Sequence, residues 1–450
     1  MKISRIYLKD FHQFKDFNID LTYPKGHEKE GQPLNKICFI GQSGTGKTSL
    51  LELIPKFLRN YNTNLTSKSG EASLTKAGKV YLSFGLDNEY STEIEFITPK
   101  EPTSIGWVWG NRKHLNLETD SVEFYNFFTN EWYNKMATKL IYFPANINFD
   151  IDETTDNLIN NKEVIDFSKE HVGIVWNLIL QQIQSYQEQE LQIRQEISKI
   201  VEQASNDLDI IRKAIQKLED WKKTEFNPIQ DIADNCLNKL LKIFKLRVKT
   251  ELDIKSKKDL GFIKLEDFQD KEILYSLWST GTKQVVLTAI PLYLLKPKRT
   301  IILFDEPERS LYPDLQRSII DFYSSLTEDC QFFYSTHSPI IASSFEPWEI
   351  VELKFNEEGY VYRELYYEGE NHVDNYKYNP QYMRWDDILQ RIFDMENDGS
   401  ALRKEKLDEL AKYNVKYKKL MKQKKAESEE GKNILNDIQR LSKELSAWES

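Results

Sequence analysis

The stretch Gly41-Gln42-Ser43-Gly44-Thr45-Gly46-Lys47-Thr48 decides the fold of this chain, because it fits the pattern G-x-x-x-x-G-K-[ST] of a phosphate-binding loop. The apolar residues 36–40 predict a short buried strand before the loop, and Ser49 begins a predicted helix after it. A strand, a glycine-rich loop and a helix in this order are the setting that such a loop requires. The glycines let backbone N–H groups point at phosphate oxygens, and the helix N-terminus adds partial positive charge.

Two side chains at the end of the loop have specific expected roles. Lys47 is expected to reach the β- and γ-phosphates of a nucleotide, and Thr48 to offer its hydroxyl to Mg²⁺. A glycine-rich turn that matches the pattern by chance is the alternative, and the downstream motifs argue against it. The predicted nucleotide-binding segment consists of Gly41, Gln42, Ser43, Gly44, Thr45, Gly46, Lys47, Thr48 and Ser49.

A second motif lies far downstream, where the apolar stretch 300–304 runs into Asp305 and Glu306. Asp305 is expected to hold Mg²⁺, directly or through water, and Glu306 to act as the general base on the attacking water. A strand cap or a surface ion pair is the alternative for this carboxylate pair. His337 follows the next apolar strand, where it is expected to hydrogen-bond the γ-phosphate and the attacking water.

Length and composition describe an ordinary globular protein. The 450 residues suggest about three domains. Hydrophobic residues make up 40% and charged residues 29%, and the net charge of −10 means that any nucleic-acid binding must be local. The N-terminus has no apolar signal core, and the longest apolar runs are too short to span a bilayer. Three widely spaced cysteines and six scattered histidines predict a reducing cytoplasm, with neither a disulfide framework nor a zinc site.

Residues 170–224 interrupt the predicted head with a helical insertion. They contain no proline, and no glycine after Gly173, while apolar residues recur at heptad spacing. An unbroken helix of this length would measure roughly 80 Å at 1.5 Å per residue. Three interpretations remain open: one protruding helical arm, an antiparallel pair that doubles back near 205–207, or a surface helix packed on its own domain.

Other segments give weaker predictions. Residues 60–78 are rich in Ser, Thr and Asn and are expected to form a surface loop. Residues 231–244 and 285–295 predict helices, and Trp107, Trp109 and Trp132 are expected in the core. Alternating or apolar patterns predict strands at 3–9, 17–23, 79–85, 91–98, 139–143, 245–254, 261–265 and 331–334, and a hairpin over 349–367.

Four motifs in order resemble the ATPase head of the ABC class: GQSGTGKT (41–48), WSTGTKQ (278–284), LFDEPE (303–308) and STHSP (335–339). The opening YLKDFHQFKDFNIDL and the helical insertion are more similar to the SMC and RecF branch, often labelled AAA family ATPase in bacteria. The resemblance covers residues 1–365. It implies an α/β fold, an ABC-type P-loop ATPase head of mixed sheets with flanking helices, a helical or coiled-coil insertion and a helical C-terminal region.

The resemblance also implies domain boundaries and residue roles. The head would occupy 1–165 and 229–370, the arm 166–228 and the charged helical region 371–450. ATP and Mg²⁺ would be bound, with Thr48 and Asp305 on the metal. Lys47, Glu306 and His337 would be catalytic. Ser279, Thr280 and Gly281 would form the signature that contacts the γ-phosphate bound on the opposite subunit, and 309–311 the loop that crosses the dimer interface.

Two positions depart from the family pattern. Thr282 stands where the signature usually has an acidic residue. No clear glutamine follows strand 139–143, where the family places its Mg²⁺-sensing loop, although Asn146 or Asn148 could substitute. These departures leave the rate of hydrolysis open, but not nucleotide binding.

The C-terminal stretch RWDDILQRIFDMEN (384–397), followed by charged helices, resembles the ATPases of bacterial anti-phage systems such as Septu (PtuA) and PARIS. Such ATPases accompany an effector nuclease. The resemblance therefore implies a cytoplasmic homodimer or higher even oligomer joined through shared ATP sites, an effector partner, possible DNA and no membrane. No nuclease activity is expected in this chain.

Three other functions remain open at this point: RecF-type DNA repair or chromosome maintenance, a transporter subunit, and a slow nucleotide-dependent scaffold. The insertion and the missing glutamine argue against the transporter. A lysine block separates two further interpretations, since it is either a solvated helix face or a docking surface for nucleic acid or an acidic partner. It comprises seven lysines in fourteen residues that lack Asp and Glu, namely Lys412, Lys416, Lys418, Lys419, Lys422, Lys424 and Lys425.

Overall fold

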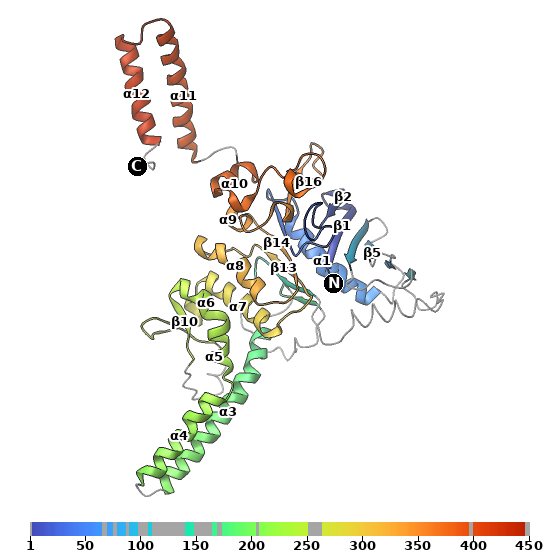
Figure 1. The fold of residues 1–450 in the computed structure, drawn as a ribbon, viewed down its shortest axis with the longest axis vertical. Helices are drawn as coiled ribbons and strands as arrows, with labels where there is room; N and C mark the ends of the chain where they lie inside the picture. Colours follow the sequence, from blue (N-terminus) through green and yellow to red (C-terminus); the bar gives the residue numbers. More distant parts are fainter. Residues whose placement is uncertain are drawn as a thin grey trace. The chain divides into compact units, whose positions relative to one another are not determined.

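The computed structural model describes residues 2–64, 70–74, 79–86, 90–97, 107–109, 140–147, 164–168, 173–203, 207–250, 263–395 and 399–445. The chain forms two compact units, Met1–Tyr382 and Met383–Ser450, which are described separately. The first unit contains the large sheet and the helices packed on it, and the described part of the second contains helices and no strand (Figure 1).

One thirteen-stranded sheet organises the first unit, in the order β7-β4-β5-β6-β1-β2-β16-β15-β3-β14-β13-β8-β9. The six strands β15, β3, β14, β13, β8 and β9 run parallel, whereas β1, β2 and β4 to β7 pair antiparallel. The strands are β1 Lys2–Phe11, β2 Phe14–Asp20, β3 Lys36–Gly41, β4 Gly70–Leu74, β5 Lys79–Leu86, β6 Tyr90–Ile97, β7 Trp107–Trp109, β8 Leu140–Phe143, β9 Val164–Asp166, β13 Ile301–Asp305, β14 Gln331–Ser335, β15 Ile350–Phe355 and β16 Val361–Glu364.

The parallel strands form the buried centre of this sheet. Every residue of β13 and β14 is buried, as expected for parallel strands covered on both faces. Because β3, β14 and β13 are parallel neighbours, the segments that follow them leave the sheet at the same edge. The phosphate loop, the Asp305–Glu306 pair and the His337 segment are those three segments.

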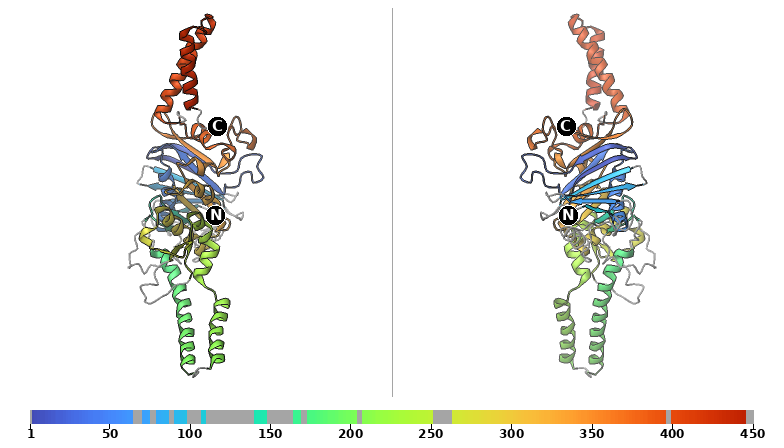
Figure 2. Two further views of the ribbon diagram at one scale, coloured as in Figure 1. Left: turned by 90° about the vertical axis from the view of Figure 1, so that its left-hand side faces the viewer. Right: turned by 90° about the vertical axis from the view of Figure 1, so that its right-hand side faces the viewer.

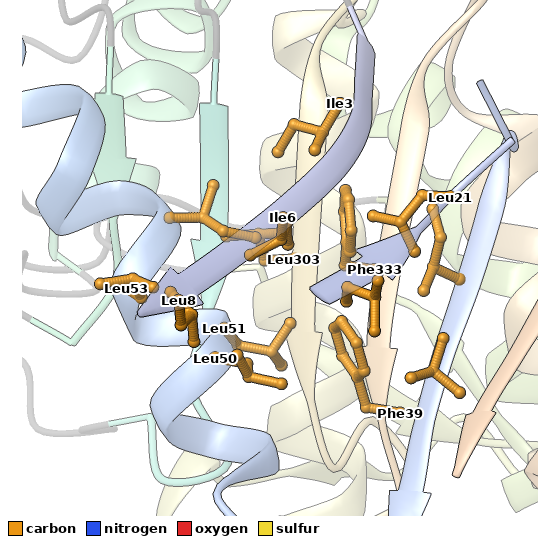
Figure 3. Close-up of a cluster of buried hydrophobic side chains, with 14 of the residues drawn as sticks. Ile3, Ile6, Leu8, Leu21, Phe39, Leu50, Leu51, Leu53, Leu303 and Phe333 are labelled. Atoms are coloured by element: carbon orange, nitrogen blue, oxygen red, sulfur yellow. The ribbon is translucent and has the colours of Figure 1, made fainter. Parts of the chain in front are cut away.

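Helix α1, Lys47–Asn64, packs its apolar side against this sheet. Figure 3 shows Leu50, Leu51 and Leu53 of the helix beside Leu303 and Phe333 of the central strands. All of these side chains are at most 2% exposed, so the helix that follows the phosphate loop is anchored in the core. The helix also continues past Pro55, which therefore does not end it.

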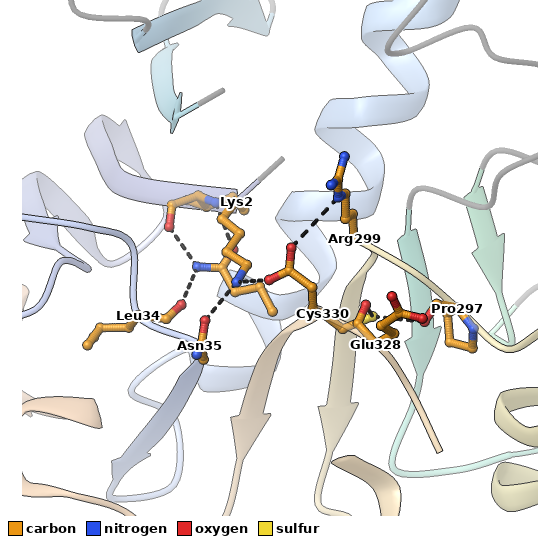
Figure 4. A network of polar contacts seen from close by, with 10 residues as sticks. Lys2, Leu34, Asn35, Pro297, Arg299, Glu328 and Cys330 are labelled. Carbon is orange, nitrogen blue, oxygen red and sulfur yellow. Dashed lines mark hydrogen bonds and ion pairs between the residues drawn. The ribbon is translucent and has the colours of Figure 1, made fainter. Parts of the chain in front are cut away.

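A polar network fastens the first strand to the centre of the sheet (Figure 4). The buried side-chain amide of Gln331 donates to the carbonyl oxygens of Ile3 and Leu34 at 2.8 Å and accepts from the Ile3 N–H at 2.7 Å. Lys2 Nζ donates to Asn35 and Asp329 at 2.7 Å. These bonds lie where β3 and β14 begin, at the sheet edge opposite the phosphate loop.

The insertion doubles back as an antiparallel pair, α3 Gly173–Gln203 and α4 Leu208–Thr224 (Figures 1 and 2). Asp207 begins the second helix by accepting hydrogen bonds from the N–H groups of the next turn. Tyr186 stacks on Trp221 at 5.0 Å between ring centroids, and Lys217 pairs with Glu196 at 3.1 Å. The antiparallel alternative is therefore confirmed, and the single long helix is wrong.

The chain returns to the sheet through helical segments and a small three-stranded sheet. These are α5 Pro228–Ile232, a π-helical turn Ala233–Leu237, α6 Asn238–Leu241, a 3-10 turn Lys242–Phe244, β10 Leu246–Val248, β11 Leu265–Asp267 and β12 Glu272–Ile273. After a 3-10 turn at Tyr275–Leu277 come α7 Thr280–Leu295, α8 Pro313–Ser325 and α9 Pro339–Ala342. Cys38, Cys236 and Cys330 are buried free thiols.

Several predicted boundaries are wrong. The predicted loop 60–78 contains β4 (Gly70–Leu74), which forms five register pairs with β5, so strand pairing outweighs its polar composition. Helix α7 begins at Thr280 rather than at 285, because Ser279 caps it. Trp107 and Trp109 lie in strand β7, whereas Trp132 lies outside the described residues, as do residues 251–254 of the predicted strand 245–254.

The second unit confirms the predicted helical C-terminal region. It contains α10 Trp385–Arg391, α11 Ala401–Lys422 and α12 Glu429–Leu445, and the last two pack against each other. Ile434 and Leu441 of α12 are buried, whereas no residue of α11 is fully buried. In the described parts of both units, every helix is too short or too polar to cross a membrane.

Candidate nucleotide-binding site

The phosphate loop turns out of β3 at Gly41 and enters α1 at Lys47. Gly41, Gly44 and Gly46 all have positive φ, at 142°, 88° and 84°. A Cβ atom on Gly46 would overlap Gln13 and Phe14, and one on Gly41 would overlap the Leu353 carbonyl oxygen. Glycine is therefore required at both positions by backbone conformation and by space.

The β1–β2 turn supports this loop, which the sequence analysis did not anticipate. Gln13 Nε2 donates to the Gly44 carbonyl oxygen at 3.2 Å. Thr45 is buried, and its hydroxyl donates to the Gln42 carbonyl oxygen at 2.8 Å. Of the other polar side chains in this segment, Gln42, Ser43 and Thr48 are exposed and Ser49 is half-buried.

Lys47 is buried with its ammonium group inside the loop. Its Nζ donates to the carbonyl oxygens of Gly41 at 2.8 Å and Gln42 at 3.0 Å. Burial lowers the pKa of Lys47 to about 8, although the nearby Glu306 and Asp305 carboxylates act in the opposite direction. The loop thus holds a desolvated cation that an anionic ligand would stabilise.

Thr48 and Asp305 come together from the two motifs. The Thr48 hydroxyl lies 3.1 and 3.0 Å from the two carboxylate oxygens of Asp305, which also accepts a hydrogen bond from Ser335. Burial raises the pKa of Asp305, and these two hydrogen bonds act against that shift. A hydroxyl beside a carboxylate is a set of hard oxygen donors, which fits Mg²⁺.

Glu306 and His337 leave the sheet beside this pair. Glu306 is half-buried and has a positive φ of 48°, and its N–H donates to the Ser335 carbonyl oxygen at 3.0 Å. Burial and the Lys47 charge lower the pKa of His337, so its imidazole is neutral at neutral pH. The structure therefore brings Lys47, Thr48, Asp305, Glu306 and His337 to one edge of the sheet.

Glu308 is a further residue of this edge that the sequence analysis missed. It is 9% exposed, and its Oε1 atom accepts from the Thr336 hydroxyl at 2.5 Å and from the His337 N–H at 3.2 Å. Burial raises the pKa of Glu308 to about 7, and the Glu306 carboxylate adds to the shift. The available signal was the second glutamate of Asp305-Glu306-Pro307-Glu308, directly after a buried strand.

The signature residues lie on a separate surface at the start of α7. Ser279 and Thr280 are exposed, and the Ser279 hydroxyl caps the helix by accepting from the Thr282 N–H at 3.1 Å. The buried Thr282 hydroxyl lies 2.8 Å from the Ser279 hydroxyl, so this departure from the family pattern supports the signature serine. A Cβ atom on Gly281 would overlap the Ser310 carbonyl oxygen.

The remaining predicted residues are less informative. Asn146 is exposed in a bend after β8, and Asn148 lies outside the described residues. Among the residues that the structure describes, no hydrogen bond joins Ser279 or Thr280 to the phosphate loop of the same chain. The signature and the phosphate loop are therefore two separate parts of one molecule.

Residues 1–342 match the model of the AAA ATPase domain family (AAA_15). Among solved structures, the chain is similar to the Smc head bound to the C-winged helix domain of ScpA, with 14% identity and a TM-score of 0.35 over 81% of this chain and 97% of that chain. A Smc head with an extended coiled coil bound to the C-terminal domain of ScpA, from Pyrococcus furiosus, gives 14% identity and a TM-score of 0.36 over 81% and 96%. The SMC head domain from Thermotoga maritima gives 12% identity and a TM-score of 0.34 over 81% of this chain and 99% of that chain. No curated protein matches the sequence.

Proposed function

Since the chain belongs to the AAA ATPase domain family, we propose that it binds ATP with Mg²⁺ and hydrolyses ATP in sites shared between two copies. The phosphate loop and Lys47 bind the triphosphate of ATP. Thr48 and Asp305 hold Mg²⁺, which when bound supplies positive charge to the β- and γ-phosphate oxygens. Glu306 accepts a proton from the attacking water, and neutral His337 hydrogen-bonds the γ-phosphate.

The observation that carries the shared site is the exposed surface around Ser279. Leu277 and Tyr312 are 71% and 69% exposed, and they flank the signature and the 309–311 segment respectively. Leu274, which lies a few residues before the signature in the sequence, is also 62% exposed. Exposed apolar side chains that gather beside exposed polar groups favour burial against a second molecule. A second copy would supply the ligand of Ser279, which is the γ-phosphate of the ATP bound in the phosphate loop of that copy.

The test uses Glu306→Gln, which keeps the side-chain shape but removes the base. We expect this variant to remain dimeric with ATP in gel filtration and to hydrolyse ATP at most at a few per cent of the wild-type rate. Near wild-type turnover would show that Glu306 is not the base. An ATP-loaded variant that remains monomeric would argue against the shared site.

Ser279→Arg separates binding from sharing. The variant is expected to bind ATP as an isolated subunit but not to associate. Mixed with Lys47→Ala subunits, it can form at most one complete site, because one subunit supplies the phosphate loop and the other the signature. Full activity of either variant as a homodimer would contradict shared sites.

We propose effector control in anti-phage defence as the cellular role, with a cytoplasmic location and an even-numbered oligomer. The similarity of 384–397 to anti-phage ATPases supports this proposal, together with the second unit that follows the head. The partner would be an effector protein, expected to be a nuclease. Co-purification of the product of a neighbouring reading frame tests the proposal, and its consistent absence would argue against effector control.

Binding of DNA, as in RecF-type repair, is the second candidate. It is favoured by the lysine block of α11 and the turn after it. All seven lysines are exposed, and none has a carboxylate within 4.0 Å among the described residues. Contacts between these lysines and phosphates would release counterions, so DNA binding would weaken steeply with salt.

A further inference from the structure

Side chains join two loops that have different roles in the proposed function. One loop faces the second copy, and the other faces the bound ATP. The first loop, 306–311, follows β13, and the second, 336–338, follows β14. Glu308 in the first loop binds the second loop with its carboxylate, through the Thr336 hydroxyl at 2.5 Å and the His337 N–H at 3.2 Å. The Glu308 carbonyl oxygen also accepts from the Leu311 N–H at 2.9 Å, which closes the first loop on itself.

Gln316 of α8 makes a second connection between the same loops. Its Nε2 atom donates to the Leu311 carbonyl oxygen at 2.9 Å. Its Oε1 atom accepts from the Ser338 hydroxyl at 2.7 Å. One amide side chain therefore bonds the end of the first loop and the end of the second, so neither loop can shift relative to the other without breaking a bond.

The signature helix is in contact with the same segment. Gln284 of α7 donates to the Pro307 carbonyl oxygen at 3.3 Å, and Gly281 packs against the Ser310 carbonyl oxygen. Gln284, Glu308 and Thr336 are 5%, 9% and 0% exposed, so water competes little for these hydrogen bonds.

We propose that Glu308 and Gln316 are positioning residues that make the 309–311 segment and the His337 loop move as one body. The inference rests on the proposed function, in which 309–311 faces the second copy and His337 faces the ATP bound to its own subunit. A displacement of Ser310 by the arriving copy would move Leu311, then Gln316, then Ser338 and the adjacent His337. Docking of the second copy would thereby set the position of the histidine.

The test replaces Gln316 with leucine, which has a similar volume but cannot form either hydrogen bond. We expect kcat for ATP hydrolysis to fall about ten- to a hundredfold, since a shift of about 1 Å at a catalytic group has this effect. KM, the affinity of the isolated subunit for a fluorescent ATP analogue and ATP-driven association should each change less than about twofold. Arg317→Leu, on the exposed side of the same helix, is the matched control and should retain wild-type kcat.

Gln316→Glu is the second variant if the leucine variant does not fold. The carboxylate can still accept from Ser338 but repels the Leu311 carbonyl oxygen, so kcat should fall in the same way. Thermal melting identifies folded variants. If a folded Gln316 variant hydrolyses ATP as fast as Arg317→Leu, the inference is overturned.

Mixed dimers test whether the two loops are joined. A subunit carrying both Ser279→Arg and Gln316→Leu is paired with a differently tagged Lys47→Ala subunit. The only complete site then uses the phosphate loop and His337 of the Gln316 variant, with the signature and the 309–311 segment of the Lys47→Ala subunit. We expect this dimer to be slower than one that pairs Ser279→Arg alone with Lys47→Ala, and equal rates would overturn the joining of the loops.

Failure of the proposed function would look different. A wild-type chain that neither hydrolyses ATP nor associates with it would overturn the proposed function, and this inference with it. A wild-type chain that does both, while the Gln316 variants match the control, would overturn this inference alone.

Discussion

Glu308→Gln should change how the stability of the head depends on pH. The folded protein raises the pKa of Glu308 from its ordinary 4.5 to about 7, mainly by burial. Since the folded pKa is the higher one, the unfolded chain releases this proton first as the pH rises. The free energy of unfolding therefore declines between about pH 4.5 and pH 7 and stays reduced above that range. At about 1.4 kcal/mol per pH unit, the full loss is about 3 kcal/mol.

Glutamine remains neutral and keeps an oxygen that accepts from Thr336 and His337. The free energy of unfolding of the variant minus that of the wild type should therefore rise by about 3 kcal/mol between pH 4.5 and 7.5. Urea unfolding followed by tryptophan fluorescence, at half-unit pH steps, measures this difference. Glu357→Gln, in the exposed β15–β16 turn, is the control for loss of a surface carboxylate.

A difference that is constant across this range would refute the reasoning, because it would mean that Glu308 titrates alike in the folded and unfolded chain. The neighbouring Glu306 carboxylate contributes to the raised pKa. Glu306→Gln should therefore make the pH dependence smaller without removing it, since burial is the larger cause. A complete loss of the pH dependence in Glu306→Gln would assign the effect to the charge pair instead.

Three further predictions concern binding and association. Lys47→Ala should weaken ATP binding about ten- to a hundredfold, as expected for loss of a charged hydrogen-bond donor. Unchanged affinity in fluorescence titration would contradict the assignment of Lys47 to the ATP site. Gly281→Ala should lower the melting temperature, because overpacking against Ser310 destabilises the fold by about 1–3 kcal/mol, whereas the higher helix propensity of alanine stabilises it by only about 1 kcal/mol. The same variant should lose ATP-driven association in gel filtration. Changing four lysines to glutamate should leave the ATPase rate intact. The four are Lys412, Lys416, Lys419 and Lys422. Loss of DNA binding alone would favour the nucleic-acid role, and loss of effector binding alone would favour the defence role. If neither changes, the lysine block is a solvated surface.

Much of the candidate site could be predicted because its signals are local. Each motif follows a short apolar strand, and parallel strands bring their ends together whatever the length of chain between them. That is why the sequence alone places residues as far apart as Thr48 and Asp305 in one site, where the structure separates their side-chain oxygens by 3.0 Å. The sequence does not decide the turn of the insertion, because the heptad pattern continues on both sides of Asp207 and only the cap decides where a new helix begins.

The supporting contacts could not be predicted, because they join residues that no periodic pattern connects. Gln13 reaches Gly44, and Gln316 reaches both Leu311 and Ser338, yet a lone glutamine in a turn or on a helix carries no signal of its partner. Strand β4 cannot be predicted from the sequence for a related reason. Its antiparallel pairing with β5 stabilises the strand, whereas its polar sequence shows no strand pattern.

The backbone of the 306–311 segment points to the same conclusion as its side chains. Glu306 and Ser310 have φ values of 48° and 60°, a conformation that costs a residue with a side chain roughly 1–2 kcal/mol. Such strain persists only where the surroundings over-determine the backbone. Here the Glu306 N–H bonds Ser335 at 3.0 Å, and the Glu306 carbonyl oxygen accepts from the Arg309 N–H at 3.1 Å. A strained segment held from β14, α7 and α8 at once has few independent positions, which is the property that a contact between two copies needs in order to act on His337.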